Sequence, residues 1–148
     1  MKRLSVILAS GTLAMSAQAV NWIELSKTNS GSVFSIDTES IESSDIQIID
    51  EKSVDNVTVS IRITYPQSKS EGNKTVIAYS DQQLLLSCKD ASYYKRAYVN
   101  YDSNDKVIKS WQSDKPILTS KDFKLTSPNT IARKIVDQTC KKPQSVKP

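Results

Sequence analysis

The sequence contains no histidine among its 148 residues. This absence excludes Ser-His-Asp triads, Cys-His pairs, His-ligated zinc or haem, and an imidazole switch near neutral pH. The three glycines are too few for a loop that cradles phosphates. No apolar run is long enough for an ordinary transmembrane helix. We therefore expect a small domain that binds a protein ligand, with no enzymatic activity, no metal and no cofactor.

The N-terminus has the features of a secretory leader. Lys2 and Arg3 precede the apolar run Leu4–Met15, and the small-residue motif Ala17-Gln18-Ala19 follows. This order predicts a signal peptide over residues 1–19, cleaved after Ala19, and a protein exported to the periplasm, the cell surface or the medium. The alternative, a short membrane anchor, is disfavoured because the apolar run is too short. We expect no transmembrane segment after cleavage.

The chain that remains after cleavage has 129 residues, with 18 basic and 16 acidic side chains. Its net charge of +2 does not indicate a nucleic-acid partner, which would need a concentrated basic face. We expect one domain over residues 20–140, followed by a disordered basic tail over residues 141–148. Both cysteines lie in the domain, and an exported chain with two cysteines has one possible internal pairing. The expectation is a Cys88–Cys140 disulfide, with two free thiols as the alternative.

Alternating apolar and polar residues predict a sheet. The alternation is strictest in Val57–Tyr65, and Pro66 marks its end. Less regular patterns predict further strands at Asn21–Leu25, Ser32–Asp37, Ile46–Lys52, Lys74–Cys88 (with a break near Asp81), Ala91–Asp102 and Lys106–Trp111. The intervening segments Thr38–Ser44 and Gln112–Thr126 are expected to be a loop and a connector.

The last element is predicted to be a helix that ends near Cys140. Ser127 is a suitable N-cap, and Pro128 suits the first helical position. Ile131, Ile135 and Val136 follow at helical spacing and form an apolar stripe. The predicted fold class is therefore α+β: an antiparallel sheet of about six strands with one C-terminal helix packed on a face and tied by the disulfide.

The candidate binding patch is Tyr94, Lys95, Arg96 and Tyr98. In a regular strand Tyr94, Arg96 and Tyr98 share one face, and tyrosine and arginine are favoured at protein-binding hot spots. The alternative is that these tyrosines form cross-strand pairs with a structural role.

Three further groups of residues are expected to be structural. Trp22 and Trp111 are expected to pack in the core or on the sheet. The acidic residues Asp37, Glu39 and Glu42 lack the spacing of a calcium-binding loop and are expected in a solvated loop. No pair of carboxylates stands out as a hydrolytic pair, so a small hydrolase is the least favoured function.

The order of these motifs resembles the surface-adhesin protein E-like family of Gram-negative bacteria. The residues that carry the resemblance are Trp22, Gly31, Phe34 and Asp37, the Leu84–Cys88 strand end, Tyr101, Asp102 and Val107 of the hairpin, and the Ser127-Pro128 helix ending in Cys140. The resemblance implies a six-stranded antiparallel sheet backed by a C-terminal helix and tied to it by a disulfide. It also implies binding of host matrix or serum proteins such as laminin, vitronectin and plasminogen.

The sequence departs from that family in one respect that bears on location. No cysteine for lipid attachment lies near the cleavage site. The product could therefore stay in the periplasm, and the alternative function is a structural or envelope-assembly accessory protein without a host ligand.

Overall fold

The computed structural model describes residues 20–44, 46, 48, 56–66 and 76–141. The predicted signal peptide and the tail beyond residue 141 lie outside these residues, as does most of the predicted strand Ile46–Lys52.

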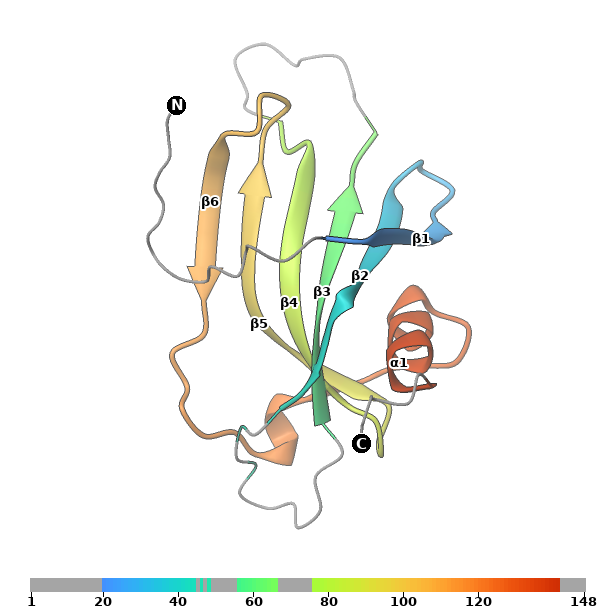
Figure 1. Ribbon diagram of the computed structural model, residues 1–148, viewed down its shortest axis with the longest axis vertical. Coiled ribbons are helices and arrows are strands. Elements are labelled where there is room, and N and C mark those ends of the chain that lie inside the picture. Colours follow the sequence, from blue (N-terminus) through green and yellow to red (C-terminus); the bar gives the residue numbers. More distant parts are fainter. Residues whose placement is uncertain (1–19, 45, 47, 49–55, 67–75, 142–148) are drawn as a thin grey trace.

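The described chain forms one antiparallel sheet with a helix at its C-terminal end (Figure 1). The strands of the main sheet are β1 Trp22–Lys27, β2 Val33–Ser43, β3 Asn56–Thr64, β4 Tyr79–Ser87, β5 Ser92–Tyr101 and β6 Val107–Gln112. They lie side by side in chain order. After the short 3-10 helix η2 Ser120–Asp122 come β7 Lys124–Leu125 and the helix α1 Ile131–Lys141. The α+β fold is confirmed, and β7, which pairs with the start of β5, adds a seventh strand inside the expected connector.

The two faces of the sheet differ because β3 alternates as predicted. Val57, Val59 and Ile61 are buried on one side, which we call the helix face. Thr58 and Ser60 point to the other side, which we call the open face. The period of two in a strand therefore sends every apolar residue of β3 toward the helix.

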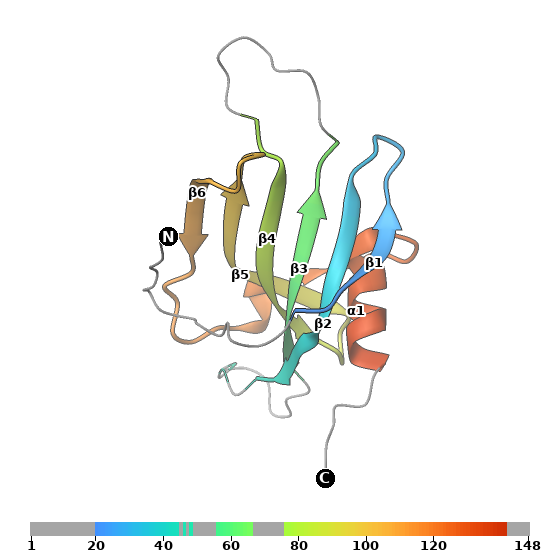
Figure 2. The ribbon, with the colours of Figure 1, turned by 45° about the horizontal axis from the view of Figure 1, so that its top comes forward.

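The helix α1 covers part of the helix face through its predicted apolar stripe (Figure 2). Ile135 and Val136 are buried in the main core. The helix begins at Ile131, so the predicted N-cap at Ser127 and first helical position at Pro128 are wrong. Asn129 has a positive φ of 67°, which interrupts a helix, and the Thr130 side chain then caps the new end by accepting the backbone N–H of Arg133 at 3.2 Å. No helix in the described ranges is long and apolar enough to cross a membrane.

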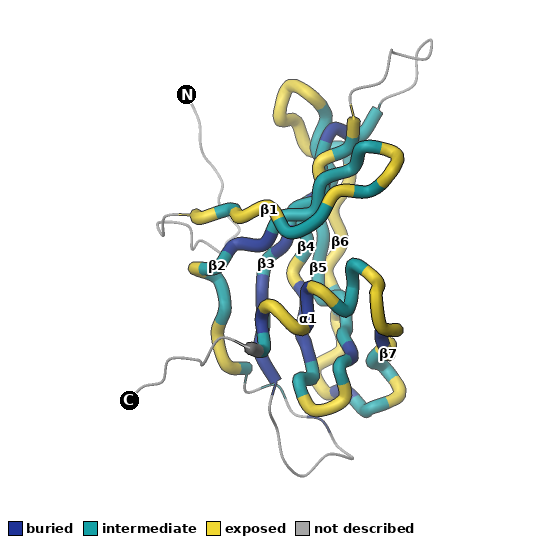
Figure 3. Tube along the Cα trace, turned by 90° about the vertical axis from the view of Figure 1, so that its right-hand side faces the viewer, coloured by how far each residue is buried: buried dark blue, intermediate teal, exposed yellow. Residues whose placement is uncertain are grey.

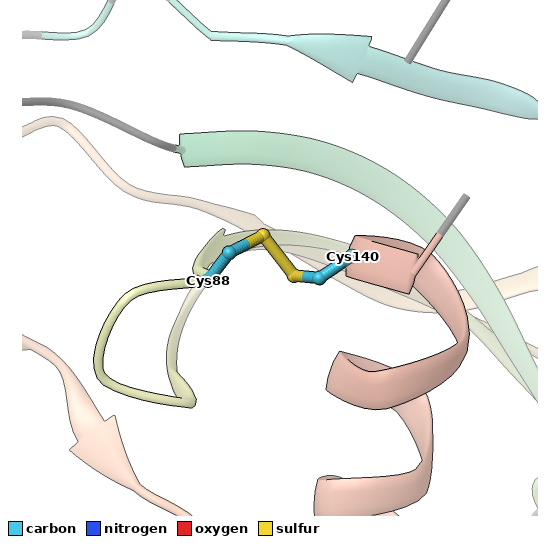
Figure 4. Close-up of a disulfide and its surroundings, with 2 residues drawn as sticks. All are labelled: Cys88 and Cys140. Atoms are coloured by element: carbon cyan, nitrogen blue, oxygen red, sulfur yellow. A yellow bond between two sulfur atoms is a disulfide. The ribbon is translucent and has the colours of Figure 1, made fainter. Parts of the chain in front are cut away.

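The predicted disulfide joins Cys88, just after β4, to Cys140 in the last turn of α1 (Figure 4). The two Cα atoms are 5.7 Å apart, within the usual range for a disulfide. Both sulfurs pack against the main core, so the bond fixes the helix to the sheet.

A second, smaller core lies at one end of the open face. Leu85 and Leu118 are buried there together with Ile48, which forms an isolated parallel bridge with Leu118. Figure 3 shows buried stretches in the strands as well as in α1. Of the predicted strand Ile46–Lys52, the structure describes Ile46 and Ile48 alone, and neither belongs to the main sheet.

Two predicted interruptions of the sheet are wrong. The segment Thr38–Ser44 is not a loop, because β2 continues to Ser43 across a bulge. At the bulge the backbone N–H of Ser60 still has a hydrogen-bond acceptor, because it donates to the Ser40 hydroxyl at 2.8 Å. The predicted break near Asp81 is also absent, and β4 pairs with β3 without interruption.

Candidate binding surfaces

A β-bulge divides the predicted binding patch between the two faces of the sheet. Lys95 of β5 pairs with Leu84 of β4. Ala97, two residues later, pairs with Gln83, which is only one residue away from Leu84 on the antiparallel strand. Arg96 is therefore the extra residue of the bulge. One extra residue inverts the alternation of all the side chains that follow it.

The consequence is that Tyr94 and Tyr98 lie on opposite faces, so the expectation of a common face is wrong. Tyr94 lies on the open face, where it packs in the second core with its ring 6.1 Å from that of Phe123. Its hydroxyl is hydrogen-bonded to Ser113. Tyr94 therefore has a structural role, while Lys95 and Tyr98 stay together on the helix face.

Lys95, Tyr98 and Trp111 form a contiguous row on the helix face, which we call the aromatic–basic surface. The Lys95 ammonium lies 5.5 Å from the centroid of the Tyr98 ring. Tyr98 pairs across strands with Trp111 of β6, and their ring centroids are 5.8 Å apart. Trp111 therefore packs on the sheet, one of the two expected placements. It is not part of the core, because it is 43% exposed. Lys109, two residues earlier on this edge strand, lies on the same face.

An apolar groove adjoins the aromatic–basic surface where α1 stops covering the sheet. It has a volume of about 460 Å³. Its lining residues include Phe34, Ile63, Tyr65, Tyr93, Ile131 and Lys95. Lys95 thus belongs to both the groove and the aromatic–basic surface, and the two are continuous.

On the open face, Arg62 is the centre of a cluster that sequence reasoning missed. Its guanidinium donates to both carboxylate oxygens of Asp81, at 2.6 and 2.8 Å. It also lies between two rings, 4.7 Å from the centroid of Trp22 and 4.4 Å from that of Tyr79. The hydrogen bond with Asp81 is the main cause that raises the pKa of Arg62. The sequence shows Arg62 only as a polar residue of β3, because its partners on β1 and β4 depend on the register.

Two tyrosines extend this cluster to the β5–β6 turn. The Tyr79 hydroxyl donates to Asp105 at 2.7 Å, and the Tyr79 and Tyr101 rings stack with centroids 4.7 Å apart. Burial, with help from the Asp105 hydrogen bond, raises the pKa of Tyr79, and burial also raises the pKa of Tyr101. Both phenols are therefore neutral at physiological pH, and their role is structural.

Next to this cluster the open face contains an acidic hollow of about 580 Å³. Its lining includes Val20, Trp22, Asp37, Glu39, Glu42 and Asp81. None of the described residues that line it is a lysine or an arginine. The charge of Asp81 is balanced by Arg62, so an excess of negative charge comes from the three carboxylates of β2.

Asp37 is not in a solvated loop as predicted. It is 8% exposed, and its carboxylate accepts the backbone N–H groups of Asn21 and Glu39, both at 3.0 Å. Glu39 and Glu42 are exposed, as expected. Asp37 therefore anchors the start of β1 against the bulge of β2.

A solved structure of Haemophilus influenzae protein E, in its crystal form II, has a similar fold. The TM-score is 0.50 and the sequence identity is 18%, over 93% of this chain and 97% of that chain. No protein-family model matches the sequence, and no curated protein does. At this identity the similarity shows the fold, which agrees with the arrangement that the family resemblance implied.

Proposed function

We propose that this protein is an exported, non-enzymatic domain that holds a protein ligand on its aromatic–basic surface. The observation that carries the proposal is Trp111, a tryptophan left 43% exposed on an edge strand. Tryptophan and tyrosine are enriched at binding hot spots because they offer a large apolar area with a polar end. Stacking already holds Trp111 and Tyr98 in place, so binding would cost little side-chain entropy.

The neighbouring groove supports a protein as the ligand. A partner with apolar side chains would fill the groove beside α1, and a partner carboxylate would pair with Lys95 at its rim. The family resemblance favours host matrix or serum proteins as the source of that partner. Two carboxylates of the open face are already engaged, since Asp37 accepts backbone N–H groups and Asp81 pairs with Arg62, which supports a role other than hydrolysis.

Binding to immobilised laminin and vitronectin tests the proposal. We expect saturable binding that weakens about 10-fold or more in Trp111→Ala and in Tyr98→Ala, the usual effect of removing a hot spot. Leu125→Ala is the matched control, because Leu125 is a 73% exposed apolar residue on β7 outside the aromatic–basic surface. Circular dichroism would verify that each variant is folded.

Two results would contradict the proposal. The first is equal weakening by Leu125→Ala, which would indicate nonspecific apolar adsorption. The second is the absence of saturable binding of the unmutated chain at micromolar concentration, which would remove the host-protein assignment.

A further inference from the structure

The start of β1 is held tightly at the edge of the acidic hollow. The backbone N–H of Asn21 donates to the Asp37 carboxylate at 3.0 Å, and the Asn21 side-chain amide donates to the Thr38 hydroxyl at 2.9 Å. The backbone N–H of Thr38 in turn donates to the carbonyl of Asn21 at 3.3 Å. These three bonds fix residue 21 against β2, and Figure 1 shows the start of β1 crossing in front of the neighbouring strands.

This anchoring places the nitrogen of Val20 near the Asp37 carboxylate. Val20 itself lines the hollow. Successive backbone nitrogens are at most about 3.7 Å apart, so the Val20 nitrogen lies within about 7 Å of the Asp37 carboxylate oxygen that accepts the Asn21 N–H. Val20 is 55% exposed, which leaves room for a hydrated, charged group at this point.

We propose that the acidic hollow holds the chain's own N-terminal ammonium group, which forms when the leader is removed after Ala19. Before cleavage the Val20 nitrogen is a neutral amide; after cleavage it is a cation at the hollow that Asp37, Glu39 and Glu42 also line. An opposite charge within about 4–6 Å favours the charged form of an amine, and the effect weakens with distance. Cleavage thereby adds one positive charge opposite the three carboxylates of β2, at a hollow whose lining residues include no lysine or arginine. The inference rests on the export that the proposed function includes.

The other charges at the hollow do not oppose this placement. Asp81 from β4 adds a further carboxylate, and Arg62 from β3 already neutralises it through two hydrogen bonds. The excess negative charge of β2 is therefore left for the ammonium group. Because Glu39 and Glu42 are exposed, the attraction is screened by salt and is modest in size.

The test uses residues 20–148, which include every described residue, with Val20 made the first residue by removing an N-terminal fusion with a protease in vitro. The NMR chemical shifts of Val20 followed against pH report the titration of its amine. We expect the titration midpoint to fall by about half a pH unit in the double variant Glu39→Gln/Glu42→Gln. Asp37 is left unchanged because its carboxylate supports the backbone. Asp137→Asn, which removes an exposed carboxylate from α1, should leave the midpoint unchanged.

A second measurement compares the melting temperature of the free-amine chain with that of its N-acetylated form. An amine whose pKa is raised by folding stabilises the fold fully below its unfolded pKa and loses this effect as pH rises through the folded pKa. The free-amine chain should therefore melt higher by about 1–2 °C at pH 6, and the difference should vanish by pH 10. The double glutamine variant, which keeps Asp37, should show a smaller difference at pH 6 and none by pH 10.

Several outcomes would overturn the inference. One is a titration midpoint that is the same in the unmutated chain and the double variant. Another is a midpoint lowered equally by Asp137→Asn, which would indicate the general field of the protein. N-terminal sequencing of the protein from cells tests processing separately, and a first residue other than Val20 would reject cleavage after Ala19 without changing the result obtained in vitro.

Discussion

At the scale of single residues, Arg62 makes several contacts that each depend on the shape of its guanidinium group. A lysine at this position would keep the charge but lose the two-point hydrogen bond to Asp81 and the stacking between Trp22 and Tyr79. We expect Arg62→Lys to lower the free energy of unfolding by about 1–2 kcal/mol in urea denaturation. Lys134→Arg exchanges the same residue types at an exposed helix position and should change it by less than about 0.5 kcal/mol. Equal effects of the two variants would show that the geometry at Arg62 contributes nothing.

Arg96 shows why the predicted patch could not be placed from the sequence. The alternation of polar and apolar residues in β5 is weak, and nothing in it marks the bulged residue. In β3 the alternation is strict, no bulge occurs, and the prediction of inward and outward residues is confirmed. A bulge changes the pairing with a neighbouring strand, and that pairing is a property of two segments rather than one.

At the scale of elements, the Asp102 carboxylate helps to hold the turn of the β5–β6 hairpin. Asp102 accepts the backbone N–H groups of Asn104 at 2.8 Å and Lys106 at 3.0 Å, and these bonds lower the pKa of Asp102. A carboxyl group with a lowered pKa stabilises the fold above its unfolded pKa, near 4, and loses this effect as pH falls through the folded value. Asp102→Asn should therefore melt lower by about 1–3 °C at pH 7, and the gap should close near pH 2.

The control for this pH dependence is Asp114→Asn, an exposed carboxylate beyond β6. Thermal unfolding followed at a series of pH values should show no comparable closing gap in that variant. A gap between Asp102→Asn and the unmutated chain that persists at pH 2 would mean that the carboxylate charge is not the cause.

The buried side of a helix or strand was predictable where the spacing of apolar residues alone determines it. The apolar stripe of Ile131, Ile135 and Val136 identified the buried side of α1 correctly. The helix start was not predictable, because Ser127-Pro128 is a favourable start by local preference. The left-handed backbone at Asn129 prevents a helix from running through this residue. The helix therefore starts after it, and the Thr130 side chain caps it.

At the scale of the whole molecule, each candidate site is made by more than one strand of the sheet. The Arg62 cluster takes its rings from β1 and β4, and the aromatic–basic surface joins β5 to the edge strand β6. Hydrophobic periodicity determines which side of a strand is buried, and this was sufficient to predict the α+β class. It does not determine the register between strands, and so it could not predict either constellation.

The disulfide links the end of β4 covalently to α1, and its contribution to the free energy of unfolding can be measured. Cys88 and Cys140 are 52 residues apart, and closing a loop of that length in the unfolded chain gives a stabilisation of at most about 4 kcal/mol in the chain-entropy description. We expect reduction to lower the free energy of unfolding by about 2–4 kcal/mol in urea denaturation. The oxidised protein should weigh about 2 Da less than the reduced one by intact mass.

The double variant Cys88→Ala/Cys140→Ala separates the effect of the covalent bond from that of side-chain packing, because reduction keeps both side chains and the variant removes them. If the free energy of unfolding falls in the variant but not on reduction, the effect comes from packing. If both thiols are alkylated without a reductant, the disulfide does not exist.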